Sequence, residues 1–163
     1  MHMKKVIMIL ACLVMSASIY AQDITGKWFQ TNSTVEEGTE VNYVDTLTLA
    51  RNNSFSDVVM VEMKMDDGNG KQIAIKLAIC CAGTWSCEKD VLTRTYDSKS
   101  VRAEILEPAG LPKVISSMIT KKAVSEFRKQ TKEPQHSKIL ELTADELSIQ
   151  SGDAEENKEY YIR

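Results

Sequence analysis

Three consecutive runs of alternating apolar and polar residues constrain this chain more than any other feature of its sequence. They cover residues 41–49, 55–65 and 73–79. A period of two places successive side chains on opposite faces, so each run predicts a β-strand with one buried face. Turn residues at 51–53 separate the first two runs, and an Asp-Asp-Gly-Asn-Gly sequence at 66–70 separates the last two. Because asparagine and glycine accept the positive φ angles of tight turns, the strands are expected to be antiparallel neighbours.

Strand patterns continue on both sides of one helical segment. Further short runs lie at 91–96 and 101–105, and three more at 139–142, 147–149 and 158–163. Between these two groups, residues 111–133 carry apolar side chains at steps of three and four, with Pro112 near the start and Pro134 just beyond the end. This spacing predicts an amphipathic helix of about five to six turns. The chain is therefore expected to be mainly β, with about nine strands and one long helix before the last three.

The helix at 111–133 has distinct apolar and basic sides. Its apolar positions are Leu111, Val114, Ile115, Met118, Ile119, Ala123, Val124 and Phe127. Its polar side carries Lys113, Lys121, Lys122, Arg128, Lys129 and Lys132 against Glu126 and Glu133, a net charge of +4. Such a helix could contact a membrane surface, an anionic ligand or a protein. We favour the simpler interpretation, in which it packs on the acidic remainder of the protein with its lysines in solvent.

Residues 1–21 have the organisation of a signal peptide. Lys4 and Lys5 precede an apolar run at 6–15, and small residues then lead to a cleavage point before Gln22. We therefore expect a single domain, 22–163, that is exported to the periplasm or secreted. A second interpretation, which we rank lower, anchors the protein as a lipoprotein through Cys12. The apolar run is shorter than the ~20 residues that cross a bilayer, and no later segment approaches that length, so no transmembrane segment is expected.

The charge of the chain argues against nucleic-acid binding. Removal of Lys4 and Lys5 with the leader changes the net charge from −3 to −5. Proteins that neutralise phosphates need clustered positive charge, and no arginine-rich tract is present.

Residue patterns that carry catalysis or bind metals are scarce. The sequence contains no nucleophile elbow, phosphate-binding loop or dinucleotide fingerprint, and His136, expected in a loop, is the only histidine after the leader. Cys80, Cys81 and Cys87 do not have zinc-ligand spacing. A disulfide would require the chain to turn at residues 82–83, and buried free thiols are the preferred interpretation. The acidic turn at 66–70 lacks the full spacing of a calcium loop, so we interpret it as a plain hairpin. We predict no metal, no cofactor and no enzymatic activity.

Residues at the two ends of the domain carry a resemblance to a known family. Gly26-Lys27-Trp28 lies on the expected first strand, and Arg163 closes the last. This pair resembles the calycin pattern, in which a tryptophan packs across one end of an antiparallel barrel and an arginine covers its ring. A cation over an indole contributes about 0.5 to 2 kcal/mol. With residues 83–86, 92–93, 140–147 and 160–163, nearly the whole domain resembles small exported bacterial lipocalin-like proteins.

The resemblance implies a single up-and-down lipocalin-like β-barrel of about 8–10 strands. Two features depart from the lipocalin pattern. The Thr-Asp-Tyr element is absent, because residues 95–97 have these residue types in another order, and the helix precedes the last three strands instead of following the barrel. Strand order around the helix is therefore left open.

The alternating runs also predict which side chains line the inside of such a barrel. The expected lining residues are Phe55, Val59, Val61, Met63, Met65, Ile73, Ile75, Leu77, Ile79 and Trp85. A lining of this kind favours a small apolar or amphipathic ligand. In the alternative, the same side chains fill the barrel completely and the protein is an interaction or inhibitor module. A third class, a barrel enzyme, would be indicated by a carboxylate or Tyr96 pointing into a cavity.

Overall fold

The computed structural model describes residues 23–36, 39–66, 72–108, 110–152 and 157–163. The predicted signal peptide, Cys12 and most of the acidic turn at 66–70 lie outside these ranges. The described residues form nine strands and one helix: β1 (Gly26–Glu36), β2 (Thr39–Leu49), β3 (Ser54–Asp66), β4 (Gln72–Glu88), β5 (Val91–Tyr96), β6 (Arg102–Glu107), α2 (Lys113–Gln130), β7 (Gln135–Leu142), β8 (Glu146–Ser151) and β9 (Lys158–Ile162).

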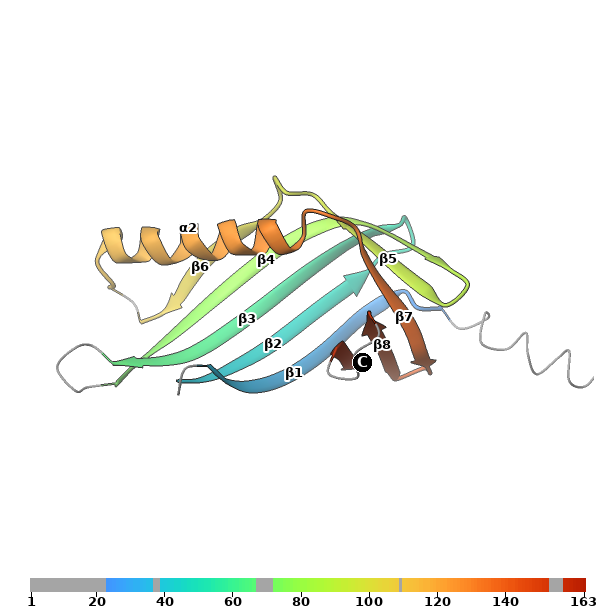
Figure 1. Ribbon diagram of the computed structural model, residues 1–163, viewed down its shortest axis with the longest axis horizontal. Coiled ribbons are helices and arrows are strands. Elements are labelled where there is room, and N and C mark those ends of the chain that lie inside the picture. Colours follow the sequence, from blue (N-terminus) through green and yellow to red (C-terminus); the bar gives the residue numbers. More distant parts are fainter. Residues whose placement is uncertain (1–22, 37–38, 67–71, 109, 153–156) are drawn as a thin grey trace, which may run out of the picture.

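Eight of the strands close into an antiparallel barrel. The ring runs β1-β2-β3-β4-β5-β7-β8-β9 and returns to β1 (Figure 1). Apart from the closing pair, and with β6 left out, neighbours in the ring are consecutive strands of the chain. The closing pair is short, with Phe29 opposite Ile162 as its register. The mainly β class, the up-and-down order and the helix before the last three strands are as the sequence predicts.

Strand β6 lies outside the ring because β4 has two different neighbours along one edge. Residues 76–80 of β4 pair with β6, whereas residues 83–88 pair with β5. At the point of divergence Ser100 replaces a strand partner: its Oγ accepts a hydrogen bond from the Ala82 N–H at 2.8 Å and also lies 3.0 Å from the Ala82 carbonyl oxygen. Gly83 follows, and the backbone of β5 approaches it too closely for any side chain.

The inner faces of the strands form two apolar clusters. The first surrounds Trp28 and Tyr161 and contains Ile24, Leu47, Leu49, Phe55, Leu92, Ile139, Leu147 and Ile149. The second contains Val41, Val61 and Leu77, with half-buried neighbours that include Tyr43, Ile79 and Ala123 of the helix. Along β2 and β3 the two clusters are separated by one inward-facing position on each strand, Asp45 and Asp57 respectively.

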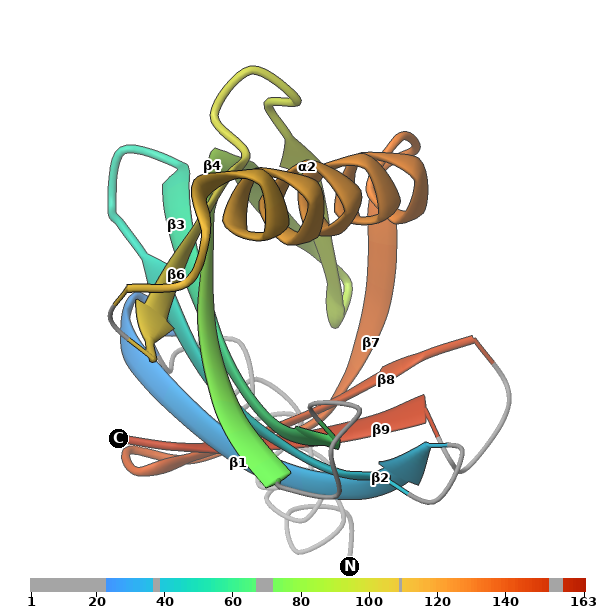
Figure 2. The ribbon, with the colours of Figure 1, turned by 90° about the vertical axis from the view of Figure 1, so that its left-hand side faces the viewer.

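Helix α2 crosses one side of the barrel, packed on β6 and spanning towards β7 (Figure 2). Its Phe127 ring meets Tyr96 of β5 edge-on, with centroids 5.8 Å apart. No residue of the helix is fully buried. The predicted apolar face is therefore wrong in its first half: Val114 is 80% exposed and Met118 is 66% exposed. The half-buried side of the helix runs through Ser116, Ile119, Ala123 and Phe127, and at about 100° per residue Val114 and Met118 lie on the other side.

Two smaller expectations also need correction. His136 lies on β7, where its Nδ1 is 3.0 Å from the Thr93 hydroxyl, and not in a loop. Strand β4 continues through residues 82–83 without a turn, and Cys80, Cys81 and Cys87 are all free. The thiols are free as expected, but the expectation that they are buried is correct only for Cys81, because Cys80 and Cys87 are exposed. In the part of the chain that the structure describes, no helix has the length and apolar character needed to cross a membrane.

Candidate functional site: a polar belt inside the barrel

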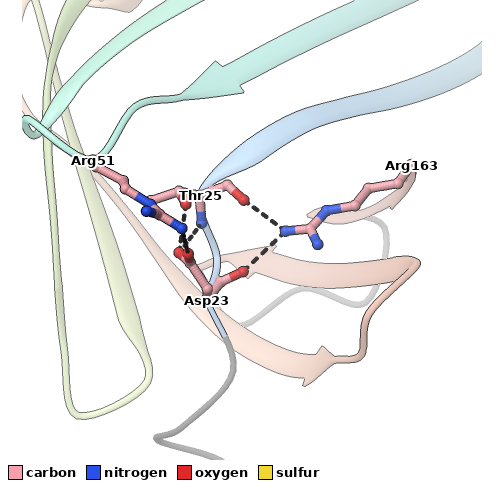
Figure 3. Close-up of polar contacts among 4 residues, drawn as sticks. All are labelled: Asp23, Thr25, Arg51 and Arg163. Carbon is pink, nitrogen blue, oxygen red and sulfur yellow. Dashed lines mark hydrogen bonds and ion pairs between the residues drawn. The ribbon is translucent and has the colours of Figure 1, made fainter.

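The two ends of the domain are joined by Arg163. Its guanidinium lies over the Trp28 ring, 4.1 Å from the centroid, and donates hydrogen bonds to the carbonyl oxygens of Asp23 and Thr25 at 2.9 and 2.7 Å (Figure 3). A third bond, 2.9 Å long, reaches the Ala144 carbonyl. These contacts seal one end of the barrel beneath the first apolar cluster.

Gly26 is required at this seal for a steric reason. Its φ of +141° is unfavourable for residues with a side chain, and a Cβ there would lie 3.2 Å from two nitrogen atoms of Arg163. Trp28 is completely buried, and its indole N–H donates to the Ile24 carbonyl at 2.9 Å. The tryptophan and the arginine of the sequence pattern are thus in direct contact, and this contact serves to fix the barrel end.

A belt of polar side chains crosses the barrel interior between the two apolar clusters. Its members are Asp45 on β2, Asp57 on β3, Arg94 on β5 and Glu159 and Tyr161 on β9. Arg94 is 3% exposed and Asp57 4% exposed. The Arg94 guanidinium forms an ion pair with Glu159 at 3.8 Å. The belt therefore combines three carboxyl groups with one arginine in a largely buried space.

The hydrogen bonds of this belt are incomplete. The Tyr161 hydroxyl lies 2.8 Å from Asp45 Oδ2 and 2.7 Å from Glu159 Oε2, yet a phenol has a single proton and can donate to only one of them at a time. Asp45 Oδ1 and Asp57 Oδ1 have no hydrogen-bond donor, and the Arg94 Nε–H has no acceptor. Donors and acceptors of the belt are therefore incompletely matched.

Burial and the neighbouring carboxyl change the titration of Asp57. Loss of water around the group, followed by a carboxyl–carboxyl hydrogen bond with Asp45, raises the pKa of Asp57 to about 9. At neutral pH Asp57 is thus protonated and donates to Asp45.

The belt also shifts the other titratable groups around it. Burial raises the pKa of Tyr161, with further contributions from Glu159 and Asp45, and burial likewise raises the pKa of Tyr96. Burial acts against the charged form of Arg94, but the surrounding oxygens of Tyr96, Tyr161, Glu159 and Asp57 outweigh it and raise the Arg94 pKa. The Cys81 thiol, opposite Asp57 in the β3–β4 register, has its pKa raised by burial first and by Asp57 second. Arg94 is the positive charge that holds this belt together.

A pocket opens on the inner face of the barrel beside the belt. It has a volume of about 210 Å³ and is lined by Gln30, Asn32, Tyr43, Asp45, Val59 and Glu159. Gln30 is opposite Asp45 in the β1–β2 register, and Asp45 is opposite Val59 in the β2–β3 register, so these side chains share the face that also buries Trp28. Two of the three belt carboxyl groups thus reach the pocket wall.

The predicted lining residues are distributed over three surroundings. Phe55 and Trp85 belong to the first apolar cluster, and Val61, Leu77, Met63 and Ile79 to the second. Val59 lines the pocket. Ile75 is buried and Ile73 half-buried, while Met65 pairs with Ile73 through its backbone but has a side chain outside the described part of the structure. The register pairs odd-numbered residues of β3 with odd-numbered residues of β4, so the nine positions whose side chains are described share the expected face.

Sequence reasoning did not single out Asp45, Asp57, Arg94 or Glu159 as site residues. A signal was present. Asp57 interrupts the row of Phe55 and Val59, and Arg94 interrupts the row of Leu92 and Tyr96. Polar residues at inward positions on neighbouring strands would have been recognised as one cluster once the strand register was known. In the described part of the chain no three His, Cys, Asp or Glu side chains converge as metal ligands.

No protein-family model matches this chain, and no curated protein matches it at a significant level.

Proposed function

We propose that this protein is an exported binding protein of lipocalin-like type whose barrel interior takes a small amphipathic molecule with a hydrogen-bond-donating or cationic head. The observation that carries the proposal is the shared Tyr161 proton. Asp45 and Glu159 both line the pocket, and both lie within hydrogen-bond distance of one phenol hydroxyl, which can donate to only one of them at a time. A ligand ammonium brings three donors and a positive charge to this position.

Pocket size restricts the part of the ligand that is enclosed. Pockets that bury a drug-sized ligand usually have about 300–1,000 Å³, whereas this one has about 210 Å³. The enclosed part is therefore a head group or a very small molecule. Tyr43 and Val59 provide apolar surface on the pocket wall, against which a short alkyl or aromatic portion packs. A ligand with a carboxylate head is disfavoured, because it would meet two carboxyl groups.

A thermal-shift series tests this preference. The probes are hexylamine, hexanol and hexanoate, which share an alkyl chain and differ in the head group. We expect hexylamine to raise the melting temperature most, hexanol less and hexanoate not at all, since a ligand that binds only the folded state stabilises it. The double variant D45N/E159Q should lose the amine response relative to its own ligand-free melting temperature.

The matched control removes two carboxylates elsewhere. Glu141 and Asp145 are exposed near the turn between β7 and β8, so E141Q/D145N changes the net charge equally and should keep the amine response. A response to hexanoate equal to that of hexylamine, or an unchanged response in D45N/E159Q, would refute the proposal.

A surface contact is compatible with this function. The alternative, an interaction or inhibitor module with a solid barrel, relies on apolar side chains outside the barrel, and Val114 and Met118 of α2 are of that kind. Because they point away from the pocket, a contact through α2 adds to ligand binding and does not compete with it.

A further inference from the structure

The outer side of helix α2 has two ends of different chemistry. The first turns carry Val114, Ile115 and Met118, all exposed. From Lys121 onward the exposed residues are mostly basic, and they include Lys122, Arg128 and Lys129. The acidic residue in this half of the helix, Glu126, is already paired with Lys129 at 2.8 Å. An apolar end and a basic end therefore share one face, and that face projects from the barrel.

The basic end borders a groove between the helix and β6. This groove has a volume of about 770 Å³, and its cationic lining residues come from both elements: Arg102 from β6, and Lys121, Arg128 and Lys129 from α2, followed by Lys132. The hydroxyl residues Thr120 and Ser125 also line it, and no acidic residue does so in the described part of the chain. The groove thus offers an anion several positive charges and two hydroxyl groups.

We infer that this helix face docks on an anionic phospholipid bilayer. The occupant follows from the combination of features. Phosphate head groups complement the cations of the groove, and the exposed side chains at the first turns of the helix reach the apolar boundary below the head groups. A soluble anion would account for the basic groove but not for Val114 and Met118. The contact leaves the barrel interior free, so it does not depend on the proposed ligand.

Vesicle co-sedimentation of the full protein tests the inference. The vesicles are phosphatidylcholine alone and phosphatidylcholine with added phosphatidylglycerol. We expect binding to the anionic vesicles, weakened by salt, and little binding to phosphatidylcholine. Each basic residue near such a surface strengthens partitioning about fivefold, so K121Q/R128Q should reduce it about 25-fold. V114S/M118S should also reduce it, and the remaining binding should become more sensitive to salt.

The matched control is K64Q/K138Q, which removes the same charge from exposed positions on β3 and β7. It should change partitioning by far less than K121Q/R128Q. Three results would overturn the inference. They are equal binding to the two vesicle types, equal effects of K121Q/R128Q and K64Q/K138Q on partitioning, and no binding to anionic vesicles at low salt. So would a dimer in sedimentation velocity that V114S/M118S dissociates without any vesicle binding, because the face would then join two copies of this chain. The substituted side chains are exposed, and circular dichroism verifies that each variant is folded.

Discussion

Replacement of Asp57 by asparagine should change how the stability of this protein depends on pH. In the folded protein Asp57 is buried, donates to Asp45 and has a pKa of about 9, whereas an unfolded aspartate has a pKa of about 3.9. Between these values the folded state holds a proton that the unfolded state releases. The contribution of Asp57 to stability is therefore fully present below about pH 4 and is lost as the pH rises towards 9. Asparagine keeps a donor for Asp45 and needs no proton.

The magnitude follows from linkage. One proton bound only in the folded state changes the free energy of unfolding by about 1.4 kcal/mol per pH unit. The free energy of unfolding of D57N minus that of the natural chain should then rise by about 4 kcal/mol between pH 5 and 8. A constant cost of the substitution shifts this difference at every pH but leaves its slope unchanged, so the slope is the quantity to measure.

Urea unfolding monitored by tryptophan fluorescence gives this slope, because Trp28 is completely buried in the folded state. Unfolding curves at pH 5, 6, 7 and 8 are compared for the natural chain, D57N and D145N, the last in an exposed turn. D145N should run parallel to the natural chain. If D57N also runs parallel to it, Asp57 is ionised in the folded protein and the proton accounting of the belt is wrong.

Two further substitutions test the barrel that surrounds the belt. Arg163→Ala removes three hydrogen bonds and the cation over Trp28, and should cost about 2 to 3 kcal/mol in urea unfolding; a loss below about 0.5 kcal/mol would show that the seal is not energetically important. Gly83→Ala places a Cβ 2.1 Å from the Thr95 carbonyl oxygen and should cost about 3 kcal/mol. At Gly152, which has a φ of +76°, the nearest atom to a Cβ is Asn157 Nδ2 at 3.7 Å, so Gly152→Ala should cost only about 1 kcal/mol.

Local sequence patterns predicted the order of the elements because that order depends on interactions close in the chain. Alternation in residues 55–65 and 73–79 determines which side chains of β3 and β4 share a face, and these two strands, consecutive in the chain, pair antiparallel. The antiparallel neighbours of an up-and-down barrel are also neighbours in sequence, so few long-range choices remain. The closure of β9 on β1 was expected only through the resemblance carried by Trp28 and Arg163.

Positions that depend on contacts distant in sequence could not be predicted. At about 100° per residue Val114 lies on the opposite side of the helix from Ala123, and the barrel covers only the side of Ala123. The apolar positions of this helix are therefore spread over two sides, and only the tertiary arrangement determines which side is covered. Similarly, Glu159 and Arg94 are 65 residues apart in the chain, and their ion pair exists because β5 and β9 face the same interior.

The polar belt is difficult to explain by stability alone. Apolar residues in place of Asp57 and Arg94 would continue the rows of their strands and merge the two apolar clusters into one core. Buried ion pairs seldom stabilise a protein more than well-packed apolar side chains of the same volume, and this belt in addition leaves Arg94 Nε without a partner. This unfavourable free energy arises in the belt, and two members of the belt, Asp45 and Glu159, line the pocket. A bound ligand with a donor would supply a second hydrogen to the two carboxyl groups that now share the Tyr161 proton. The belt would then contribute to ligand binding, although it lowers the stability of the ligand-free protein.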